Sequence, residues 1–269
     1  MHICTLAKKT VEWQGLNFSK GTITTLRMLK SLYKMPKDYK HVYALGIIAS
    51  FCCVLLRKKY NAIILALYDF TKPNMITNIL NRAEKVFVEG NKGEIEMYRL
   101  GVSLDKIVKF QHWCDQFRFA YKEKKNFNMK VLFIGRPIKI KGRHIIEECQ
   151  KLTEGIDYEY IENAPYEDLA SHYQMADVVV VPSLYSEGFS RVVIEAASCG
   201  CAVISSNRGA LPEMVSPFGK CIEPTPENFA TELNKLKFNR TALEKLQRNT
   251  AIYALKHFNE KNANCFYSL

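Results

Sequence analysis

The feature that most constrains this chain is a regular alternation of short apolar runs with longer amphipathic ones. Runs such as Lys130–Gly135 and Asp177–Val181 carry Val, Ile and Leu at successive positions, which is typical of strands buried on both faces. Between the runs lie longer segments with helical spacing, such as Arg143–Leu152 and Tyr166–Gln174. Strands that alternate with helices in this way predict the α/β class, with parallel sheets covered by helices. Ligands of such sheets bind beyond the carboxyl ends of the strands.

The same pattern extends over the rest of the chain. The further expected strands are short and apolar: His2–Ala7, Asn61–Leu67, Lys85–Val88, Lys106–Phe110, Tyr158–Ile161 and Ala202–Ser205. The further expected helices have apolar residues at helical spacing: Thr22–Tyr33, Val42–Lys59, Met75–Arg82, Gly93–Leu100, Ser190–Ser198 and Glu227 to about Phe258.

A charged stretch without periodicity, Tyr121–Asn128, comes directly before the strand that starts at Met129 and is the best linker candidate. We therefore expect two Rossmann-like domains, the first over residues 1–125 and the second starting at residue 126. The charge changes at the same place. Residues 1–128 hold 22 Lys and Arg against 10 Asp and Glu, a net charge of +12, whereas residues 129–269 hold 16 against 17. A basic half indicates a partner that carries phosphate, such as anionic lipid, nucleic acid or a phosphorylated substrate, although solubility alone also explains it.

One segment raises the question of a membrane. Val42–Leu56 is almost purely apolar and is flanked by Lys40-His41 and by Arg57-Lys58-Lys59. It is too short to cross the hydrocarbon core, which needs about 20 residues. A helix packed on a sheet is one explanation, and a helix lying in the interface of an anionic membrane is the other.

Composition excludes several classes. A hydrophobic share of 48% with 24% charged residues is ordinary for a globular protein and excludes disordered, low-complexity and polytopic membrane chains. The nine cysteines include no CxxC pair and no set of zinc ligands at usual spacing. Reduced thiols in a cytoplasmic protein are therefore expected, with no metal site.

Two clusters at predicted strand ends carry residues suited to bind phosphate and sugar. In the first, Gly135 and Arg136 end a strand, and Lys141 follows five residues after the arginine. Glycine allows close backbone approach, and Arg and Lys donate to a pyrophosphate, although a solvated basic loop has the same composition. The second cluster is Pro182–Ala196, in which a turn leads into a helix near Ser190. The amides of residues 188–190 would face a phosphate or a polar sugar there.

Glu195 lies on an otherwise apolar part of that second helix, and a buried carboxylate needs a partner. A ribose diol would provide one, and a neighbouring loop is the structural alternative. A third cluster, Ser206–Glu213, follows the next strand and contains Gly209 and Pro212, which shape a turn near the same face. By itself this segment is also compatible with an ordinary loop.

In order and spacing these clusters resemble the second domain of family-4-type retaining glycosyltransferases of the two-Rossmann-domain (GT-B) class, the glycosyl transferases group 1. The resemblance runs through VLFIGR…KG, YEDLASHYQMADVVVVPS, EGFSRVVIEAASCGCAVISS and GALPEMV. Its signature is a pair of glutamates separated by seven residues, and Glu187 and Glu195 have that spacing. The first half matches more loosely, is shorter than expected, and departs from the usual Gly-Gly loop at GLNFSKG.

The resemblance implies a GT-B fold with a central cleft, a donor domain over residues 126–255 and a segment over residues 256–269 that crosses back to the first domain. Arg136 and Lys141 would bind the donor diphosphate without a metal. Glu187 would hold the donor sugar, Glu195 the ribose, and Ala164 would lie against the base. Asp69, after a first-half strand, is a candidate to contact the transferred sugar. The implied donor-binding set is Gly135, Arg136, Lys141, Ala164, Ser183, Glu187, Gly188, Phe189, Ser190, Val192 and Glu195.

We therefore expect a retaining transferase that moves a sugar from a UDP- or GDP-linked donor to a glycan or lipid-linked acceptor. It would need no cofactor and no metal, and it would be cytoplasmic, with peripheral contact to anionic membrane as an open alternative. The rival is a nucleotide-sugar-binding module that has lost transferase activity. Nucleic acid is disfavoured as a partner because no aromatic residues interleave with the basic ones. A nicotinamide oxidoreductase is disfavoured because no GxGxxG follows a strand.

Overall fold

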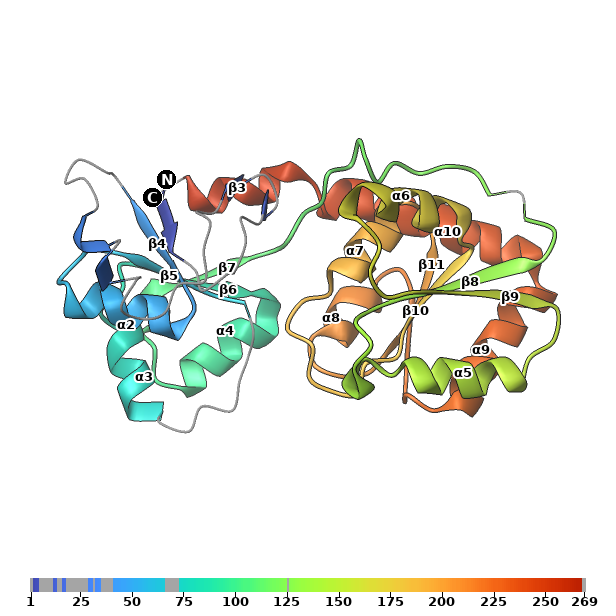
Figure 1. Cartoon of the computed structure of the whole chain (residues 1–269), viewed down its shortest axis with the longest axis horizontal. Helices are drawn as coiled ribbons and strands as arrows, with labels where there is room; N and C mark the ends of the chain where they lie inside the picture. Colours follow the sequence, from blue (N-terminus) through green and yellow to red (C-terminus); the bar gives the residue numbers. More distant parts are fainter. Residues whose placement is uncertain are drawn as a thin grey trace. The chain divides into compact units, whose positions relative to one another are not determined.

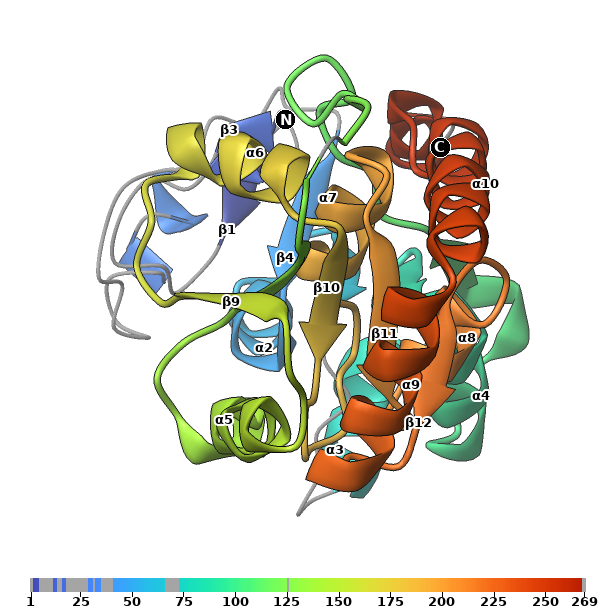
Figure 2. The same cartoon turned by 90° about the vertical axis from the view of Figure 1, so that its right-hand side faces the viewer.

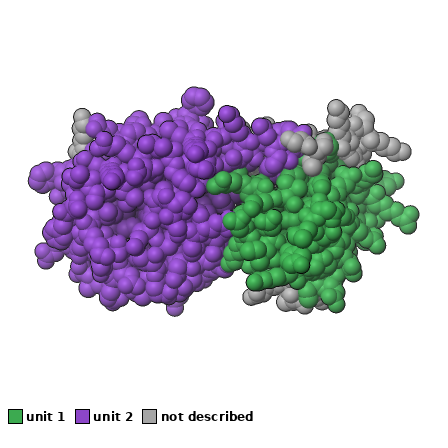
Figure 3. Space-filling view, turned by 180° about the vertical axis from the view of Figure 1, so that it is seen from behind, with its two compact units in different colours: residues 1–111 green, residues 112–269 purple. Residues whose placement is uncertain are grey.

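The computed structural model divides the chain into two compact units, Met1–Gln111 and His112–Leu269, which Figure 3 colours separately. We describe each unit by itself. The structure describes residues 2–4, 12–13, 16–17, 29–30, 32–34, 41–65, 73–124 and 126–267.

The first unit is built on a five-stranded parallel sheet in the order β1-β4-β5-β6-β7 (Figure 1). Its strands are β1 (His2–Cys4), β4 (Val42–Leu45), β5 (Asn61–Ile64), β6 (Val86–Glu89) and β7 (Ile107–Phe110). A separate antiparallel pair joins β2 (Glu12–Trp13) to β3 (Leu16–Asn17). The described helices are α2 (Ile47–Leu55), α3 (Pro73–Leu80), α4 (Gly90–Arg99) and the 3-10 turn η1 (Leu104–Lys106).

The second unit holds another five-stranded parallel sheet, in the order β12-β11-β10-β8-β9. Its strands are β8 (Met129–Ile134), β9 (Ile156–Ile161), β10 (Val178–Val181), β11 (Ala202–Ser206) and β12 (Lys220–Ile222). Its helices are η2 (Lys139–Lys141), α5 (Arg143–Lys151), α6 (Tyr166–Met175), α7 (Arg191–Ser198), α8 (Leu211–Val215), α9 (Pro226–Phe238), α10 (Arg240–His257) and η3 (Glu260–Phe266). The predicted α/β class with parallel sheets is confirmed in both units.

Alternation along the central strands gives the second sheet an apolar surface on each face. Val178 and Val180 of β10 pack into one buried cluster together with residues of α5 and α9. Val179 and Val181 pack into another together with residues of α6 and α7. In Figures 1 and 2, α6 and α7 accordingly lie on the opposite side of the sheet from α5 and α9. Strands buried on both faces explain why the sequence shows runs of Val rather than alternation with polar residues.

The compact units divide at Gln111, before the charged stretch that suggested a boundary at residue 125, because residues 112–124 pack on the second unit. Phe119 is fully buried in the second unit's core. The Lys124 ammonium donates to the carbonyl of Cys199 at 3.0 Å and to that of Tyr173 at 3.2 Å. These carbonyls lie at or near the ends of α7 and α6, where a cation is favoured by the helix dipole.

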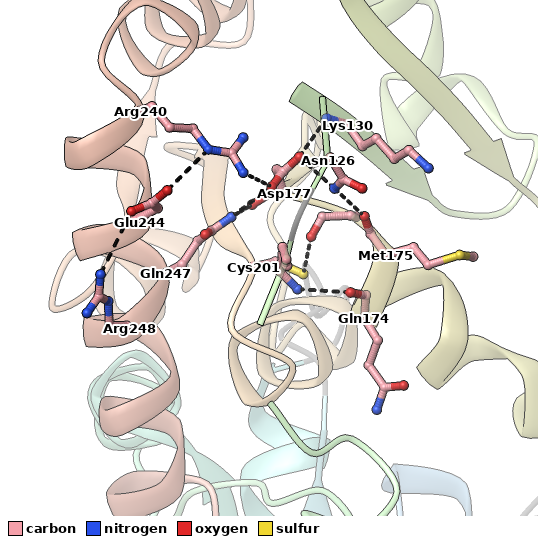
Figure 4. Close-up of polar contacts among 12 residues, drawn as sticks. Asn126, Lys130, Gln174, Met175, Asp177, Cys201, Arg240, Glu244, Gln247 and Arg248 are labelled. Carbon is pink, nitrogen blue, oxygen red and sulfur yellow. Dashed lines mark hydrogen bonds and ion pairs between the residues drawn. The ribbon is translucent and has the colours of Figure 1, made fainter. Parts of the chain in front are cut away.

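A buried carboxylate, Asp177, joins this entering segment to the sheet and to α10 (Figure 4). Its Oδ2 accepts from the Asn126 amide at 2.8 Å and from the Lys130 backbone amide at 2.9 Å. Its Oδ1 accepts from Gln247 of α10 at 3.2 Å and lies 3.7 Å from the Arg240 guanidinium. A carboxylate that is fully buried is tolerated because several donors satisfy it.

The last residues also group with the second unit. Phe258 is fully buried in its core, and the Asn262 amide donates to the His112 carbonyl at 3.1 Å. The crossing of residues 256–269 to the first domain stays a prediction.

Two predicted helices are wrong in the same way, because each contains a break. Val42–Lys59 is a strand, β4, followed by helix α2, and Gly46 between them has a φ of +83°. Glu227–Phe258 is two helices, and Asn239 separates them by accepting from the Ala242 amide at the start of α10. A single apolar run does not show where a chain changes from strand to helix, whereas a glycine or an N-cap residue does.

Candidate functional site

The order of strands in the second unit singles out one place at the edge of its sheet. From β8 the chain goes outward to β9 and then returns to the other side of β8 with β10. The connections after β8 and β10 therefore leave the sheet in opposite directions. In parallel α/β sheets, ligands bind at such a switch point, beyond the carboxyl ends of the strands. The connections after these two strands are residues 135–142 and 182–190, the first two predicted clusters.

Backbone contacts hold the two connections together. The Leu184 amide donates to the Ile140 carbonyl at 2.8 Å. Gly142 has a φ of +76°, and a Cβ added there would lie 2.1 Å from the Pro182 carbonyl oxygen. Only glycine fits this conformation and this spacing. The two loops therefore form one surface.

The side chains of that surface meet around the Glu187 carboxylate. Its Oε1 accepts from the Lys141 ammonium at 2.6 Å and from the Ser183 hydroxyl at 2.7 Å. Its Oε2 accepts from the Tyr185 hydroxyl at 2.6 Å. The Lys141 ammonium also donates to the Tyr185 oxygen at 2.7 Å. Of these four residues, Lys141, Ser183 and Glu187 were predicted and Tyr185 was missed.

This cluster combines an anion and a cation with little access to water. Glu187 is 6% exposed. Burial lowers the pKa of Lys141, but hydrogen bonds to Glu187 and Tyr185 outweigh it, so the net shift is upward and the ammonium stays charged. Such a pair can place a positive charge next to phosphate and a carboxylate next to a sugar hydroxyl.

The third predicted cluster, Ser206–Glu213, contacts the main chain of Glu187. The Ala210 amide donates to the Glu187 carbonyl at 2.8 Å. Gly209 has a φ of +65°, and a Cβ added there would lie 2.2 Å from that carbonyl oxygen and 2.3 Å from the Glu187 nitrogen. This loop thus fixes the main chain that carries the carboxylate.

Glu195 has partners within the protein. One carboxylate oxygen accepts from Nη2 of Arg191 at 2.9 Å and from Nε at 3.1 Å, and the other accepts from the Tyr173 hydroxyl at 3.1 Å. Burial raises the pKa of Glu195, and Arg191 and Tyr173 oppose that shift. Arg191 was missed although its spacing of four residues from Glu195 signals a pair on one turn of a helix. Tyr173 left no such signal because it comes from another helix, α6.

The start of α7 has the expected position but differs in its hydrogen bonds. Ser190 is the N-cap residue, yet its side chain makes no capping bond. Its amide donates to the Met214 sulfur at 3.5 Å, a weak acceptor. The Phe189 ring packs against the His112 ring, with centroids 4.3 Å apart. The side chain of Phe189 is therefore part of the packing.

The remaining predicted residues lie at the same edge of the sheet or outside the described chain. Arg136 is exposed, and its guanidinium forms no ion pair with the residues that the structure describes. Ala164 is half-buried in the connection from β9 to α6. Gly135 donates its amide to the Ile161 carbonyl at 3.0 Å, and Val192 packs partly buried on the core. Asp69 lies outside the described residues.

In the described ranges, no group of three or more His, Cys, Asp and Glu residues could hold a metal ion. The eight cysteines whose side chains the structure describes are free thiols. No helix in the described part of the chain is long and apolar enough to span a bilayer.

A model of the family described as "Glycosyl transferases group 1" matches residues 118–256, just over half of the 269-residue chain. The chain belongs to the glycosyl transferases group 1 family. The matched residues hold all three loops of the site, and the membership of the glycosyl transferases group 1 that the sequence indicated is confirmed.

Two curated members of the glycosyl transferases group 1 illustrate the similarity. The MMP alpha-(1->4)-mannosyltransferase of Mycolicibacterium hassiacum is 47% identical over 55 residues, which are 20% of this chain and 13% of that protein. The D-inositol 3-phosphate glycosyltransferase of Corynebacterium diphtheriae is 37% identical over 87 residues, 32% of this chain and 20% of that protein. The matches thus span a fifth or less of the length of these relatives.

Among solved structures, Anabaena Alr3699/HepE in complex with UDP has a TM-score of 0.74 to this chain at 15% identity, covering 91% of this chain and 82% of that one. At this identity the similarity shows the fold alone. The fold is that of the glycosyl transferases group 1, with an α/β domain in each half.

Proposed function

We propose that this protein transfers a hexosyl group from a UDP- or GDP-linked sugar to a glycan or lipid-linked acceptor, with retention of configuration and without a metal ion. The observation that carries the proposal is the Lys141–Glu187 pair at the switch point of the second sheet. Its members come from two loops held together by backbone contacts, so both charges are positioned before any ligand binds. Such preorganisation reduces the cost of stabilising charge in a transition state.

Lys141 and Arg136 are assigned to the donor diphosphate. Lys141 has one ammonium proton beyond those donated to Glu187 and Tyr185, and Arg136 is exposed and unpaired among the described residues. As the sugar leaves, negative charge grows on the diphosphate, and these cations neutralise it. This role is what makes a metal unnecessary in the proposal.

Glu187 is assigned to the donor sugar, where its carboxylate accepts from a sugar hydroxyl and stabilises the positive charge that develops on the ring. Glu195 is assigned to the ribose hydroxyls, which would exchange with the present Arg191 or Tyr173 contact. Retention follows if the acceptor attacks from the face that the phosphate leaves, since the departing phosphate oxygen then takes the acceptor's proton. No separate general base is needed.

The names of similar proteins agree in kind with this proposal. They include a mannosyltransferase and a D-inositol 3-phosphate glycosyltransferase, and a protein of the same fold was solved with UDP.

The test measures thermal unfolding of the full chain with UDP, GDP, ADP and their common sugar conjugates, in the presence of EDTA. A ligand at 100 times its Kd stabilises the unit that it binds by about 2.7 kcal/mol. We expect nucleotides with one of the three bases to raise the Tm of the wild type, and we expect Arg136→Ala to lose most of that increase. Arg248→Ala is the matched control, because Arg248 is an exposed arginine of α10 paired only with Glu244 among the described ion pairs. No shift with any nucleotide would refute the donor site.

The rival function is a module that binds a nucleotide sugar without transferring it. To separate the two functions, the protein is incubated with the nucleotide sugar that the thermal-unfolding test selects and with a panel of glycan and lipid-linked acceptors. Transfer of sugar with the anomeric configuration retained supports the enzyme. Tight binding without release of nucleoside diphosphate favours the module.

Peripheral contact with anionic membrane belongs to the same proposal, because a lipid-linked acceptor lies at such a surface. Helix α2 exposes Ile48, Phe51 and Leu55, at 44%, 37% and 52%, and the basic residues Arg57, Lys58 and Lys59 come just after its C-cap residue. Residues spaced by three and four positions share one face of a helix, so this face is apolar and ends in cations.

Flotation with vesicles of anionic or neutral lipid tests this contact. We expect binding to anionic vesicles that weakens with salt and is lost in Leu55→Asp. Leu104→Asp is the control, because Leu104 is 60% exposed but lies on η1 instead of α2. Equal binding of both variants would refute a contact through α2.

A further inference from the structure

We propose that Tyr185 is a positioning residue, which keeps the Lys141 ammonium on one oxygen of Glu187 so that each of the two charged groups keeps one hydrogen-bonding position for a ligand. This inference rests on the proposed function, because it concerns how the donor site is kept open. Tyr185 was not predicted from the sequence, and its neighbours in the site are all charged or hydroxylic.

The geometry is a closed triangle of short hydrogen bonds. The Tyr185 hydroxyl donates to Oε2 of Glu187 at 2.6 Å and accepts from Nζ of Lys141 at 2.7 Å, while the same Nζ donates to Oε1 of Glu187 at 2.6 Å. The ammonium also lies 4.8 Å from the centre of the Tyr185 ring, within range of a cation–π attraction. A single phenol thus contacts both charged groups.

Counting donors and acceptors shows what the triangle leaves unused. An ammonium has three N–H groups, and two of them go to Glu187 and Tyr185. A carboxylate has about four acceptor positions. Lys141 and Ser183 fill those of Oε1, and Tyr185 fills one on Oε2. Among the described contacts, one N–H of Lys141 and one lone pair of Glu187 therefore remain. These match a phosphate oxygen and a sugar hydroxyl.

Without the phenol the pair has a simpler arrangement available. A lysine ammonium sits on a flexible stem and rotates freely. The Lys141 ammonium would then contact both oxygens of Glu187. The two charged groups would bind each other and would no longer be available to a ligand. The Tyr185 hydroxyl prevents this by occupying Oε2 and by drawing the ammonium toward its own oxygen.

The first experiment tests the contact without any substrate. The pKa of Lys141 is measured by NMR on protein made with ¹³C-labelled lysine, which leaves the ammonium unmodified, with Lys141→Arg used to assign the signal. Tyr185→Phe should change that pKa, because the ammonium loses its hydrogen bond to the phenol and moves onto the second oxygen of Glu187. Tyr160→Phe is the matched control, since Tyr160 is also a half-buried tyrosine but its hydroxyl donates to Gln150, at 3.0 Å, and makes no contact with Lys141 or Glu187 in the described hydrogen bonds. An unchanged Lys141 pKa in Tyr185→Phe overturns the proposal.

The second experiment separates positioning from simple stability. In Tyr185→Phe we expect kcat to fall about tenfold and the Kd of the nucleoside diphosphate to rise about tenfold, because Lys141 turns from the phosphate to Glu187, while the Tm of the ligand-free chain stays the same. Tyr160→Phe should keep both values. A wild-type kcat in Tyr185→Phe also overturns the proposal. If the wild-type chain shows no transfer but Lys141 still shifts, the proposed function fails and the positioning of Lys141 stands.

Discussion

At the scale of single residues, the carboxylate of Glu187 is the group on which the site converges. Three donors reach it, and the lysine among them is the partner that the proposed chemistry needs. Glu187→Gln keeps the shape but removes the charge that would face the developing positive charge on the sugar. We expect kcat to fall by about 100-fold, while nucleotide affinity changes little.

Steady-state kinetics and nucleotide titration of the same preparation check this. Glu147→Gln is the control, because Glu147 is also an acid paired with a base of its unit, Arg143 at 2.8 Å, but lies on α5 outside the cluster. A kcat of Glu187→Gln equal to that of the control would rule out the assigned role.

A second residue-scale prediction concerns His112, which is 3% exposed and packs on Phe189. Burial, and then the charge of Arg191, lower the pKa of His112 from its ordinary 6.5 to about 3. Between these values the unfolded chain binds a proton that the folded chain does not, so stability is present above pH 6.5 and is lost as the pH falls. The slope is at most about 1.4 kcal/mol per pH unit for one such group.

Urea unfolding at pH 7 and pH 4.5 measures this contribution. Other groups also titrate there, so the comparison is between the wild type and His112→Gln. The variant should lose less stability over this interval than the wild type. Parallel losses in both chains would mean that His112 does not carry the effect.

At the scale of elements, the loops after β8 and β11 depend on glycines with positive φ, Gly142 and Gly209. Gly209→Ala would press a methyl group against the Glu187 backbone, at 2.2 and 2.3 Å, and would also adopt a left-handed conformation that costs about 1–2 kcal/mol. Gly155→Ala shares the conformation, with a φ of +58°, but its methyl would meet only the flexible end of Lys237.

We expect Gly155→Ala to lose only the conformational part, and Gly209→Ala to lose more stability and most of the transfer activity. Chemical unfolding and donor turnover of the two variants make the comparison. Equal stability and activity in both would show that the third loop does not position Glu187.

At the scale of the whole molecule, each apolar core belongs to one unit. The buried cluster of the first unit runs from Leu32 to Val102, and the two clusters of the second unit draw only on residues from Cys114 to Phe258. A unit with its own core can fold alone. We predict that a fragment over residues 112–269 folds and binds the nucleoside diphosphate with the Kd of the full chain, but transfers no sugar.

Circular dichroism and nucleotide titration of the fragment check this, with Lys141→Ala in the fragment as the control that should lose binding. An unfolded fragment, or a folded one without affinity, would show that the first unit is needed for the donor site.

Much of this protein could be predicted from local patterns. Runs of Val and Ile between amphipathic segments predicted the parallel sheets, because a strand that is buried on both faces needs apolar residues at successive positions. The residues at strand ends, Arg136, Lys141 and Glu187 among them, were predicted because parallel strands bring their carboxyl ends to one edge. Spacing along the chain was sufficient for these conclusions.

Only the tertiary structure decided which of these residues meet. The return of β10 to the far side of β8 put the Lys141 and Glu187 loops side by side, and no local pattern records strand order. The same holds for Tyr173 on Glu195, a contact between two helices. Tyr185 bridges Lys141 and Glu187 because the fold brings Lys141, which lies 44 residues earlier in the chain, within hydrogen-bonding distance of its hydroxyl. The sequence by itself determined the sheets and the chemical groups at their edge, since those depend on neighbours along the chain. The tertiary structure decided the pairing of those groups, because hydrogen bonds depend on distances in space.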